Sequence, residues 1–271
     1  MKTRIAFFSL VLMLAACGQQ SDDTAVSEES AAETLAAAAP VTSIYAEALQ
    51  NPNRLDGDSA RDATRKPGAV LEFLDIGRGD TVLEMFAGGG YYTELLASVV
   101  GDGGHVVAHM NTPLVNFGGE EYVARHADGR LPNVEVLMAE NNELSLDADA
   151  FDAITMVLNY HDLYWASDDY GWDALDVDAV LAELHKALKP GGVLGIVDHY
   201  AAAGSPSETG GTLHRIDPAV VIADLTGAGF MLDGESDILR SQADDHSKSV
   251  FDPEVRGKTD RFVLRFKKPE L

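Results

Sequence analysis

Residues 81–93 constrain the fold of this chain more than any other segment. Thr81 to Met85 is a short apolar run that predicts a buried strand, and the glycines Gly88 to Gly90 follow it closely. Tyr91 to Val99 then reads as a helix. Glycines between a strand and a helix let the backbone approach a ligand closely. The segment therefore predicts an α/β fold with a ligand-binding turn, although a tight turn that binds nothing would show the same pattern.

Apolar runs typical of strands alternate with helical stretches along most of the chain. The other predicted strands in this part are His105 to His109, Val134 to Met138, Ala153 to Leu158 and Val193 to Asp198. The other predicted helices are Ser43 to Gln50, Pro67 to Leu74, Asp176 to Leu188 and Pro218 to Ala228. Such alternation favours parallel strand pairing with right-handed crossovers.

The C-terminal part departs from this alternation. Phe230 to Leu239 and Arg261 to Phe266 are two predicted strands with no helix between them. An antiparallel hairpin at one edge of the sheet accounts for this pattern. We find no internal repeat.

Three motifs in order resemble those of class I S-adenosylmethionine-dependent methyltransferases. They are Glu84 to Gly90 at the first strand, Phe151 to Met156 at the fourth, and Leu188 to Gly192 before the fifth. The resemblance covers about residues 67–268. It implies a Rossmann-like α/β fold: a seven-stranded, mostly parallel sheet of order 3-2-1-4-5-7-6, an antiparallel C-terminal hairpin, and helices on both faces. It also implies that S-adenosylmethionine is the cofactor.

The resemblance implies which residues contact that cofactor. Gly88 and Gly90 would approach its methionine part, with Phe86 in the place of the family's first glycine. Glu84 would meet the amino group of the cofactor. The remaining implied cofactor residues are Glu140 and Asn141, which would flank the adenine, and Asn159 after the fourth strand.

One position departs from the family pattern. The family's second strand ends in an acid that holds the ribose hydroxyls, and here Met110 stands at that place. We expect Asn111 to offer an amide oxygen instead. Losing a charge-assisted hydrogen bond would weaken binding by about 1.5–3 kcal/mol. A nicotinamide-dependent oxidoreductase is disfavoured because this acid is missing and Thr93 replaces the third glycine of the dinucleotide fingerprint.

Polar residues follow the fourth and fifth predicted strands, where ligands of open α/β sheets bind. Histidine titrates near neutral pH, so His161 and His199 are candidate bases, with Asp162 or Asp198 as an orienting acid. The candidate substrate-binding residues are Tyr160, Tyr164, His214 and Arg215. Ordinary loop, cap or core roles remain open for all of these residues.

No metal site is predicted, because the candidate histidines His161, His199 and His214 show neither an H-x-x-x-H nor an H-E-x-x-H spacing among themselves. Three histidines and two aspartates on one rim nevertheless leave zinc binding open as an alternative.

The N-terminus resembles the leader of a bacterial lipoprotein. Lys2 and Arg4 precede a short apolar run that ends in Leu14-Ala15-Ala16-Cys17, and Cys17 is the only cysteine. We expect residues 1–16 to be a signal peptide, Cys17 to be lipidated, and 17–40 to be a disordered tether. The methyltransferase-like domain is then 41–271. In such lipoproteins an Asp directly after the cysteine signals retention in the inner membrane, and here Gly18 stands at that position. We therefore expect the protein to be anchored in the outer membrane, facing the periplasm.

Charge limits the partners of this 271-residue chain. With 44 acidic against 20 basic residues its formal net charge is −24, which disfavours binding to nucleic acid or adhesion to anionic lipid. We therefore expect methyl transfer to a small molecule, and membrane attachment through the lipid anchor alone. The alternative is an inactive methyltransferase-fold binding lipoprotein of the cell envelope. The sequence does not determine the oligomeric state.

Overall fold

The computed structural model describes residues 43–270, and the expected signal peptide, Cys17 and tether lie outside these residues. The described chain folds around one seven-stranded sheet with the order β3-β2-β1-β4-β5-β7-β6, as expected. The strands are β1 (Thr81–Met85), β2 (His105–Met110), β3 (Val134–Met138), β4 (Phe151–Val157), β5 (Leu188–His199), β6 (Met231–Ser236) and β7 (Arg261–Lys267).

Strand pairing follows from the connections. Strands β3, β2, β1, β4 and β5 pair in parallel, because a helix or longer connection lies between each consecutive two. Strand β7 inserts between β5 and β6 and is antiparallel to both. The expected antiparallel pair at the sheet edge is thereby confirmed.

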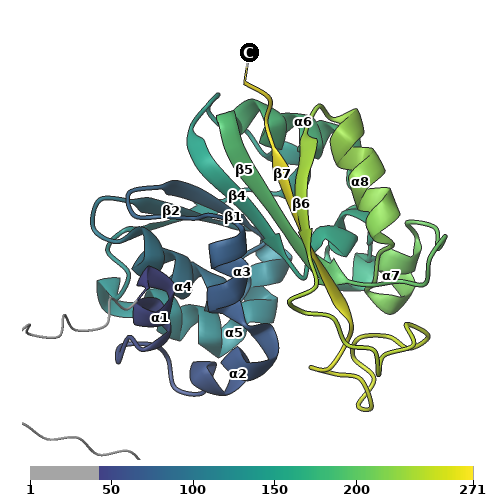
Figure 1. Cartoon of the computed structure of the whole chain (residues 1–271), viewed down its shortest axis with the longest axis horizontal. Coiled ribbons are helices and arrows are strands. Elements are labelled where there is room, and N and C mark those ends of the chain that lie inside the picture. The colour runs from purple at the N-terminus through teal and green to yellow at the C-terminus, as the bar shows by residue number, and fades with distance from the viewer. Residues whose placement is uncertain (1–42, 271) are drawn as a thin grey trace, which may run out of the picture. The chain divides into compact units, whose positions relative to one another are not determined.

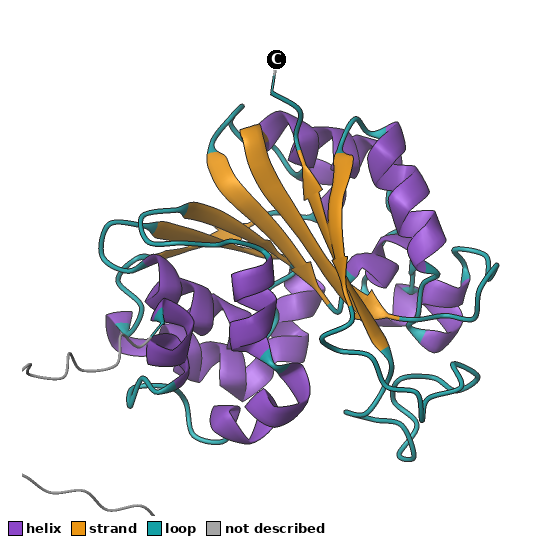
Figure 2. Cartoon of the chain, in the orientation of Figure 1, coloured by secondary structure: helices purple, strands orange, loops and turns teal. Residues whose placement is uncertain are grey.

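Helices cover both faces of this sheet (Figures 1 and 2). The α-helices are α1 (Ile44–Leu49), α2 (Asp58–Arg65), α3 (Pro67–Phe73), α4 (Tyr91–Val100), α5 (Thr112–His126), α6 (Val177–Ala187), α7 (Thr209–Leu213) and α8 (Pro218–Gly227). Short 3-10 helices are η1 (Ala127–Gly129), η2 (Asn141–Glu143), η3 (Tyr160–Tyr164) and η4 (Asp168–Tyr170). No helix among residues 43–270 has the length and apolar character needed to span a membrane.

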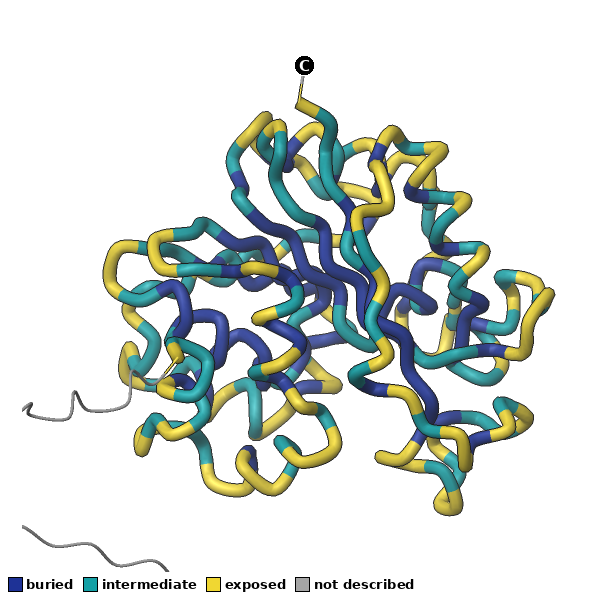
Figure 3. The backbone as a smooth tube through the Cα atoms, viewed as in Figure 1, coloured by how far each residue is buried: buried dark blue, intermediate teal, exposed yellow. Residues whose placement is uncertain are grey.

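Successive residues of each central strand enter different cores, because strand side chains alternate between faces. Val82 of β1 belongs to the core under α1, α3 and α4, whereas Leu83 belongs to the core under α6 and α8. The central strands are accordingly the most buried part of the backbone (Figure 3). Because helices cover both faces of the sheet, polar groups can gather only at the ends of the strands.

The predicted bounds of two strands, β5 and β6, differ most from the structure. The LKPGG motif, expected as a turn, lies within β5, because Leu188 already pairs with Phe151 before the ladder shifts register. The left-handed Gly191 lies in this irregular stretch, at φ +77°. Strand β6 is shorter than expected and ends at Ser236, whose hydroxyl accepts a hydrogen bond from the Ile238 amide at 3.3 Å and starts a turn.

Gly104 places the start of β2 against the end of α4. A Cβ at this position would lie 2.5 Å from Val100 Cβ and 2.7 Å from the backbone oxygen of Asp80. Gly104→Ala should therefore lower the free energy of unfolding by about 1–3 kcal/mol, measured by urea denaturation.

The neighbouring Gly103 provides the matched control, because a Cβ there would meet no atom within 4 Å. Gly103→Ala should change stability by no more than about 0.5 kcal/mol. Equal stability of the two variants would contradict the packing described for this corner.

Candidate functional site

A turn of bare backbone follows β1 at the carboxyl edge of the sheet. Phe86, Gly88 and Gly90 all have left-handed conformations, with φ values of +54°, +58° and +77°. A Cβ built at Gly88 would meet nothing closer than the Phe86 oxygen, 3.9 Å away. The left-handed conformation of Phe86 is strained by about 1–3 kcal/mol, and strained backbone of this kind clusters at functional sites. The turn thus leaves unfilled space beside Gly88, which is itself buried and shortly precedes α4.

Helix α5 closes one side of this turn. A Cβ at Gly118 would lie 3.0 Å from the Gly88 oxygen, so the two backbones are in close contact. Arg125 is fully buried, and its Nε donates to the Gly89 oxygen at 3.0 Å. The same guanidinium binds Asp58 of α2 at 2.6 Å and also contacts Glu94 of α4. These ion pairs fix α2 and α5 against the turn, and Gly88 is left as its open position.

Glu84 lies under the turn rather than at its surface. Its side chain is buried, and its Oε2 accepts a hydrogen bond from the Thr93 hydroxyl at 2.5 Å. Burial raises the pKa of Glu84 to about 8, opposed by the Thr93 hydrogen bond and the nearby Arg125 charge. Glu84 therefore carries a proton at neutral pH unless a cation approaches it.

The ends of β2 and β3 bring together the residues expected near ribose and adenine. Met110 is fully buried in the core. Asn111 caps α5, with its Oδ1 accepting from the Leu114 amide at 2.9 Å, and its Nδ2 donates to Asn141 Oδ1 at 2.9 Å. The amide oxygen expected to replace the ribose acid is therefore already engaged.

Glu140 reaches the residue that follows Asn111. Its Oε1 accepts hydrogen bonds from the Thr112 hydroxyl at 2.6 Å and from the Thr112 amide at 3.1 Å. The carboxylate of Glu140, which follows β3, thus lies just beyond β2, next to the position where the family's second-strand acid is expected.

Asn159 joins the glycine turn to the loop after β4. Its Nδ2 donates to the Met85 oxygen at 2.9 Å and to the Phe86 oxygen at 3.3 Å. Its buried Oδ1 has no hydrogen-bond partner among the described residues, and the same holds for His109 Nδ1 and Trp172 Nε1. Buried polar atoms are normally paired, so unpaired ones beside an open backbone turn are suited to a polar ligand.

His161, which follows β4, is held by the carboxylate of Asp198 near the end of β5. Asp198 Oδ2 accepts from the His161 amide at 2.8 Å, and its Oδ1 lies 2.8 Å from His161 Nδ1. His161 Nε2 lies 3.3 Å from Asp162 Oδ1, and His214 Nδ1 lies 3.6 Å from the same oxygen. Burial lowers the pKa of His161, but Asp198 and Asp162 outweigh it and raise the value to about 9.

His199 stands beside this group. Its ring centroid is 6.1 Å from that of His161, and its Nδ1 lies 2.7 Å from the Thr259 hydroxyl. Burial lowers the pKa of His199 well below its usual value, and the neighbouring His161 charge lowers it further. The structure therefore gathers all three predicted histidines, with Asp162, at one edge of the sheet.

Three of the predicted substrate residues have their polar groups engaged inside the protein. The hydroxyls of Tyr160 and Tyr164 both donate to Asp224 Oδ2 of α8, at 3.0 and 2.6 Å. Arg215 is fully buried and pairs with Asp244 at 2.8 Å. These contacts dock α8 and the loop after β6 and leave His214 as the member of the set that faces the histidine cluster.

An aromatic row connects the turn to the histidines. Phe86 and Trp172 have ring centroids 5.5 Å apart, Trp172 and Trp165 are 5.4 Å apart, and Trp165 and His214 are 5.6 Å apart. The sequence interpretation missed Trp172 and Thr259. Both tryptophans of the chain follow β4, and this clustering is the sequence signal that could have indicated a site role for Trp172.

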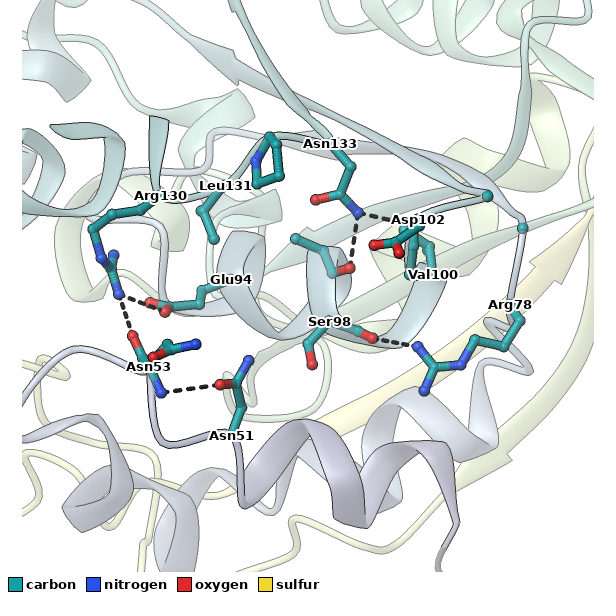
Figure 4. Close-up of a pocket in the computed structure, with 15 residues that line it drawn as sticks. Asn51, Asn53, Arg78, Glu94, Ser98, Val100, Asp102, Arg130, Leu131 and Asn133 are labelled. Carbon is teal, nitrogen blue, oxygen red and sulfur yellow. Dashed lines mark hydrogen bonds and ion pairs between the residues drawn. The ribbon is translucent and has the colours of Figure 1, made fainter. Parts of the chain in front are cut away.

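A broad surface cleft of about 1010 Å³ lies at the opposite edge of the sheet (Figure 4). Two of the residues that line it precede strands: Gly79 lies shortly before β1, and Asn133 lies directly before β3. Its polar groups mostly bind one another, as in the hydrogen bond from Arg78 to the Ser98 oxygen at 2.6 Å. It is separate from the turn and the histidine cluster.

Comparison with known proteins shows that part of the chain is similar to methyltransferases. Residues 83–196 match a family model described as "Methyltransferase domain". The chain is 30% identical over 130 residues to the ubiquinone/menaquinone biosynthesis C-methyltransferase UbiE of Teredinibacter turnerae. That match covers 48% of this chain and 47% of the enzyme, so the chain spans about half the length of this relative.

Solved structures share the fold over most of the chain. A SAM-dependent methyltransferase from Aquifex aeolicus is 25% identical, with a TM-score of 0.54, covering 77% of this chain and 93% of that one. An S-adenosylmethionine-dependent methyltransferase from Mesorhizobium loti is 15% identical, with a TM-score of 0.52, covering 76% and 99%. The second likeness concerns the fold alone.

The buried Glu84 should make stability depend on pH. Its pKa in the folded protein, about 8, lies above the ordinary 4.5, so its contribution is complete below about 4.5 and is lost as the pH rises through 8. Glu84→Gln removes this titration. Between pH 5 and 8 the free energy of unfolding should therefore shift in favour of the variant by about 3–5 kcal/mol.

Urea denaturation at several pH values measures this difference. Glu72→Gln, at an exposed position of α3, is the control and should show no such change with pH. A Glu84→Gln difference that is flat across the range would show that Glu84 ionises normally in the folded protein.

Proposed function

We propose that this chain, which carries a class I S-adenosylmethionine-dependent methyltransferase domain, transfers a methyl group from S-adenosylmethionine to a small molecule. One observation carries the proposal. Asn159 fastens the loop that leads into the histidine cluster to the carbonyls that open the glycine turn. A cofactor-binding backbone and a set of titratable groups therefore share one edge of the sheet, where ligands of such sheets bind.

The residues at the turn fit this cofactor. When bound, S-adenosylmethionine supplies an electrophilic methyl group on a sulfonium. The backbone at Gly88 has room for it, whereas Arg125 and Thr93 fill the space beside Gly90, and the unpaired Oδ1 of Asn159 can accept a hydrogen bond from it. Glu84 is a proton-bearing acid close by, and an ammonium group near it would favour its carboxylate.

We assign the ribose contact to Glu140. Met110 offers no acceptor, and the Asn111 amide is occupied by the α5 cap and Asn141. The Glu140 carboxylate lies against Thr112, immediately after these residues, and is accessible. A carboxylate can accept hydrogen bonds from two hydroxyls, which restores the charge-assisted contact that the second strand lacks. Asn141 remains the proposed adenine neighbour.

The acceptor side is formed by the histidine cluster and the aromatic row. The Thr259 hydroxyl lies 2.7 Å from Nδ1 of His199, and in the tautomer in which Nδ1 donates to it, the opposite ring nitrogen can take a proton from an acceptor. Asp198 fixes the ring of His161, which lies beside Asp162. Trp165 and Trp172 provide flat apolar walls between this cluster and Phe86, which suits a planar acceptor. The similar UbiE enzyme is named for the biosynthesis of ubiquinone and menaquinone, whose quinone rings are planar.

Calorimetric titration with S-adenosylmethionine and with its demethylated product tests cofactor binding directly. We expect binding in the micromolar range. Gly88→Asp places a charged side chain in the open space of the turn and should weaken binding at least about 100-fold, or ~2.7 kcal/mol.

Gly129→Asp is the matched control. Gly129 also has a left-handed conformation, at φ +66°, and a Cβ there meets no atom within 4 Å. This variant should bind like the wild type, so backbone strain alone cannot explain a loss at Gly88. No binding by the wild-type chain near millimolar concentration would leave a methyltransferase fold without the activity. Binding of NADH instead would favour an oxidoreductase.

We further propose that the chain is exported and anchored in the cell envelope through lipid on Cys17. The support is the basic start, the short apolar run and the single cysteine after Leu14-Ala15-Ala16. In a bacterial host fed radiolabelled palmitate, the wild-type chain should be labelled and recovered with outer membranes, because several acyl chains anchor stably. Cys17→Ser should abolish the label. Label that persists in this variant, or none in the wild type, would contradict the lipoprotein proposal.

A further inference from the structure

Three metal-ligating side chains converge beside the aromatic row. His161, Asp162 and His214 each offer one ligand atom, and these atoms all lie within 4.8 Å of one another. We propose that His161, Asp162 and His214 bind a divalent transition metal ion, for which zinc is the best match.

The distances suit tetrahedral coordination. Zinc bonds to nitrogen and oxygen measure about 2.0–2.2 Å, which places neighbouring ligand atoms ~3.4 Å apart in a tetrahedron. Asp162 Oδ1 lies 3.3 Å from His161 Nε2 and 3.6 Å from His214 Nδ1. Asp162 is therefore already at a suitable distance from each histidine, and the two histidine ligand atoms, which lie within 4.8 Å of each other, complete the set. Two imidazoles and one carboxylate form a ligand set typical of zinc and of other first-row transition metals.

Asp198 supplies the outer contact that such histidine ligands usually have. Its carboxylate lies 2.8 Å from His161 Nδ1 and also accepts the His161 amide hydrogen at 2.8 Å. These two contacts fix the ring so that Nε2 points to Asp162. A carboxylate on the far nitrogen fixes the tautomer of a metal-binding histidine and makes the ring a stronger ligand.

The backbone around the third ligand is also fixed. His214 has a left-handed conformation, at φ +53°, which is rare for a residue with a side chain. It follows α7, which packs so tightly on η3 that a Cβ at Gly210 would lie 2.5 Å from the His161 oxygen. The strain at His214 is thus held by packing that also fixes its position relative to His161.

The three ligands leave a fourth position open. His161 is buried, whereas the side chains of Asp162 and His214 are 18% and 19% exposed, so the site can be reached from solvent. Three protein ligands and an open position are the arrangement of zinc sites that bind a further molecule. If methyl transfer takes place here, a step that rests on the proposed function, the open position suits an acceptor that coordinates through oxygen.

Metal binding is measured on the full-length chain without an affinity tag and without S-adenosylmethionine. After treatment with a chelator, the protein is mixed with Zn²⁺, passed through gel filtration, and assayed for zinc by mass spectrometry. We expect one zinc ion per chain. Because no cofactor is present, this result is independent of whether S-adenosylmethionine binds.

Variants identify the site. His214→Ala and Asp162→Ala should each weaken zinc binding by more than about 100-fold, and Asp198→Asn by about 10–100-fold. His105→Gln is the matched control, because His105 and Glu135 form a histidine–carboxylate pair of 3.5 Å on exposed strand positions. This variant should bind zinc like the wild type, and circular dichroism confirms that each variant is folded.

Two results would overturn the proposal. One is a wild-type chain that retains no zinc after gel filtration. The other is equal retention of zinc by the wild type and by the folded His214→Ala and Asp162→Ala variants.

Discussion

The hydrogen bonds from the Asn159 amide to the Met85 and Phe86 oxygens link the two halves of the candidate site. Strands β1 and β4 pair in parallel, so the residues that follow them emerge at the same edge. Asn159 then fixes the distance between the loops. Each such hydrogen bond contributes only about 0.5–1.5 kcal/mol, but the geometry of turn and cluster depends on it.

The sheet could be predicted from the sequence because local patterns and chain connections specify it. Strands β1 and β3 have the predicted bounds, and the strand order is that of the family. The boundaries of β5 and β6 were harder to predict from the sequence. Leu188 enters the sheet early because it pairs with Phe151, and a partner in another strand leaves no mark in the local pattern.

The sequence predicted where the site residues lie better than it predicted the role of each side chain. Residues after β1, β4 and β5 gather at one edge, as parallel topology requires. Their hydrogen-bond partners depend on distant segments, and these partners decide what each group can do. Arg215 is engaged by Asp244, and Asn111 is engaged by Asn141, 30 residues away. Likewise, the distance along the chain between Asp162 and His214 conceals their approach to 3.6 Å.

The crystal structure of the full-length chain with S-adenosylhomocysteine, the demethylated cofactor, tests the central claim most directly. The account predicts the ligand at the carboxyl edge of the sheet, against the backbone of Gly88 and in contact with Asn159. A ligand in the cleft lined by Arg78 and Asn133 at the opposite edge, or a glycine turn that holds no ligand at saturating concentration, would contradict it.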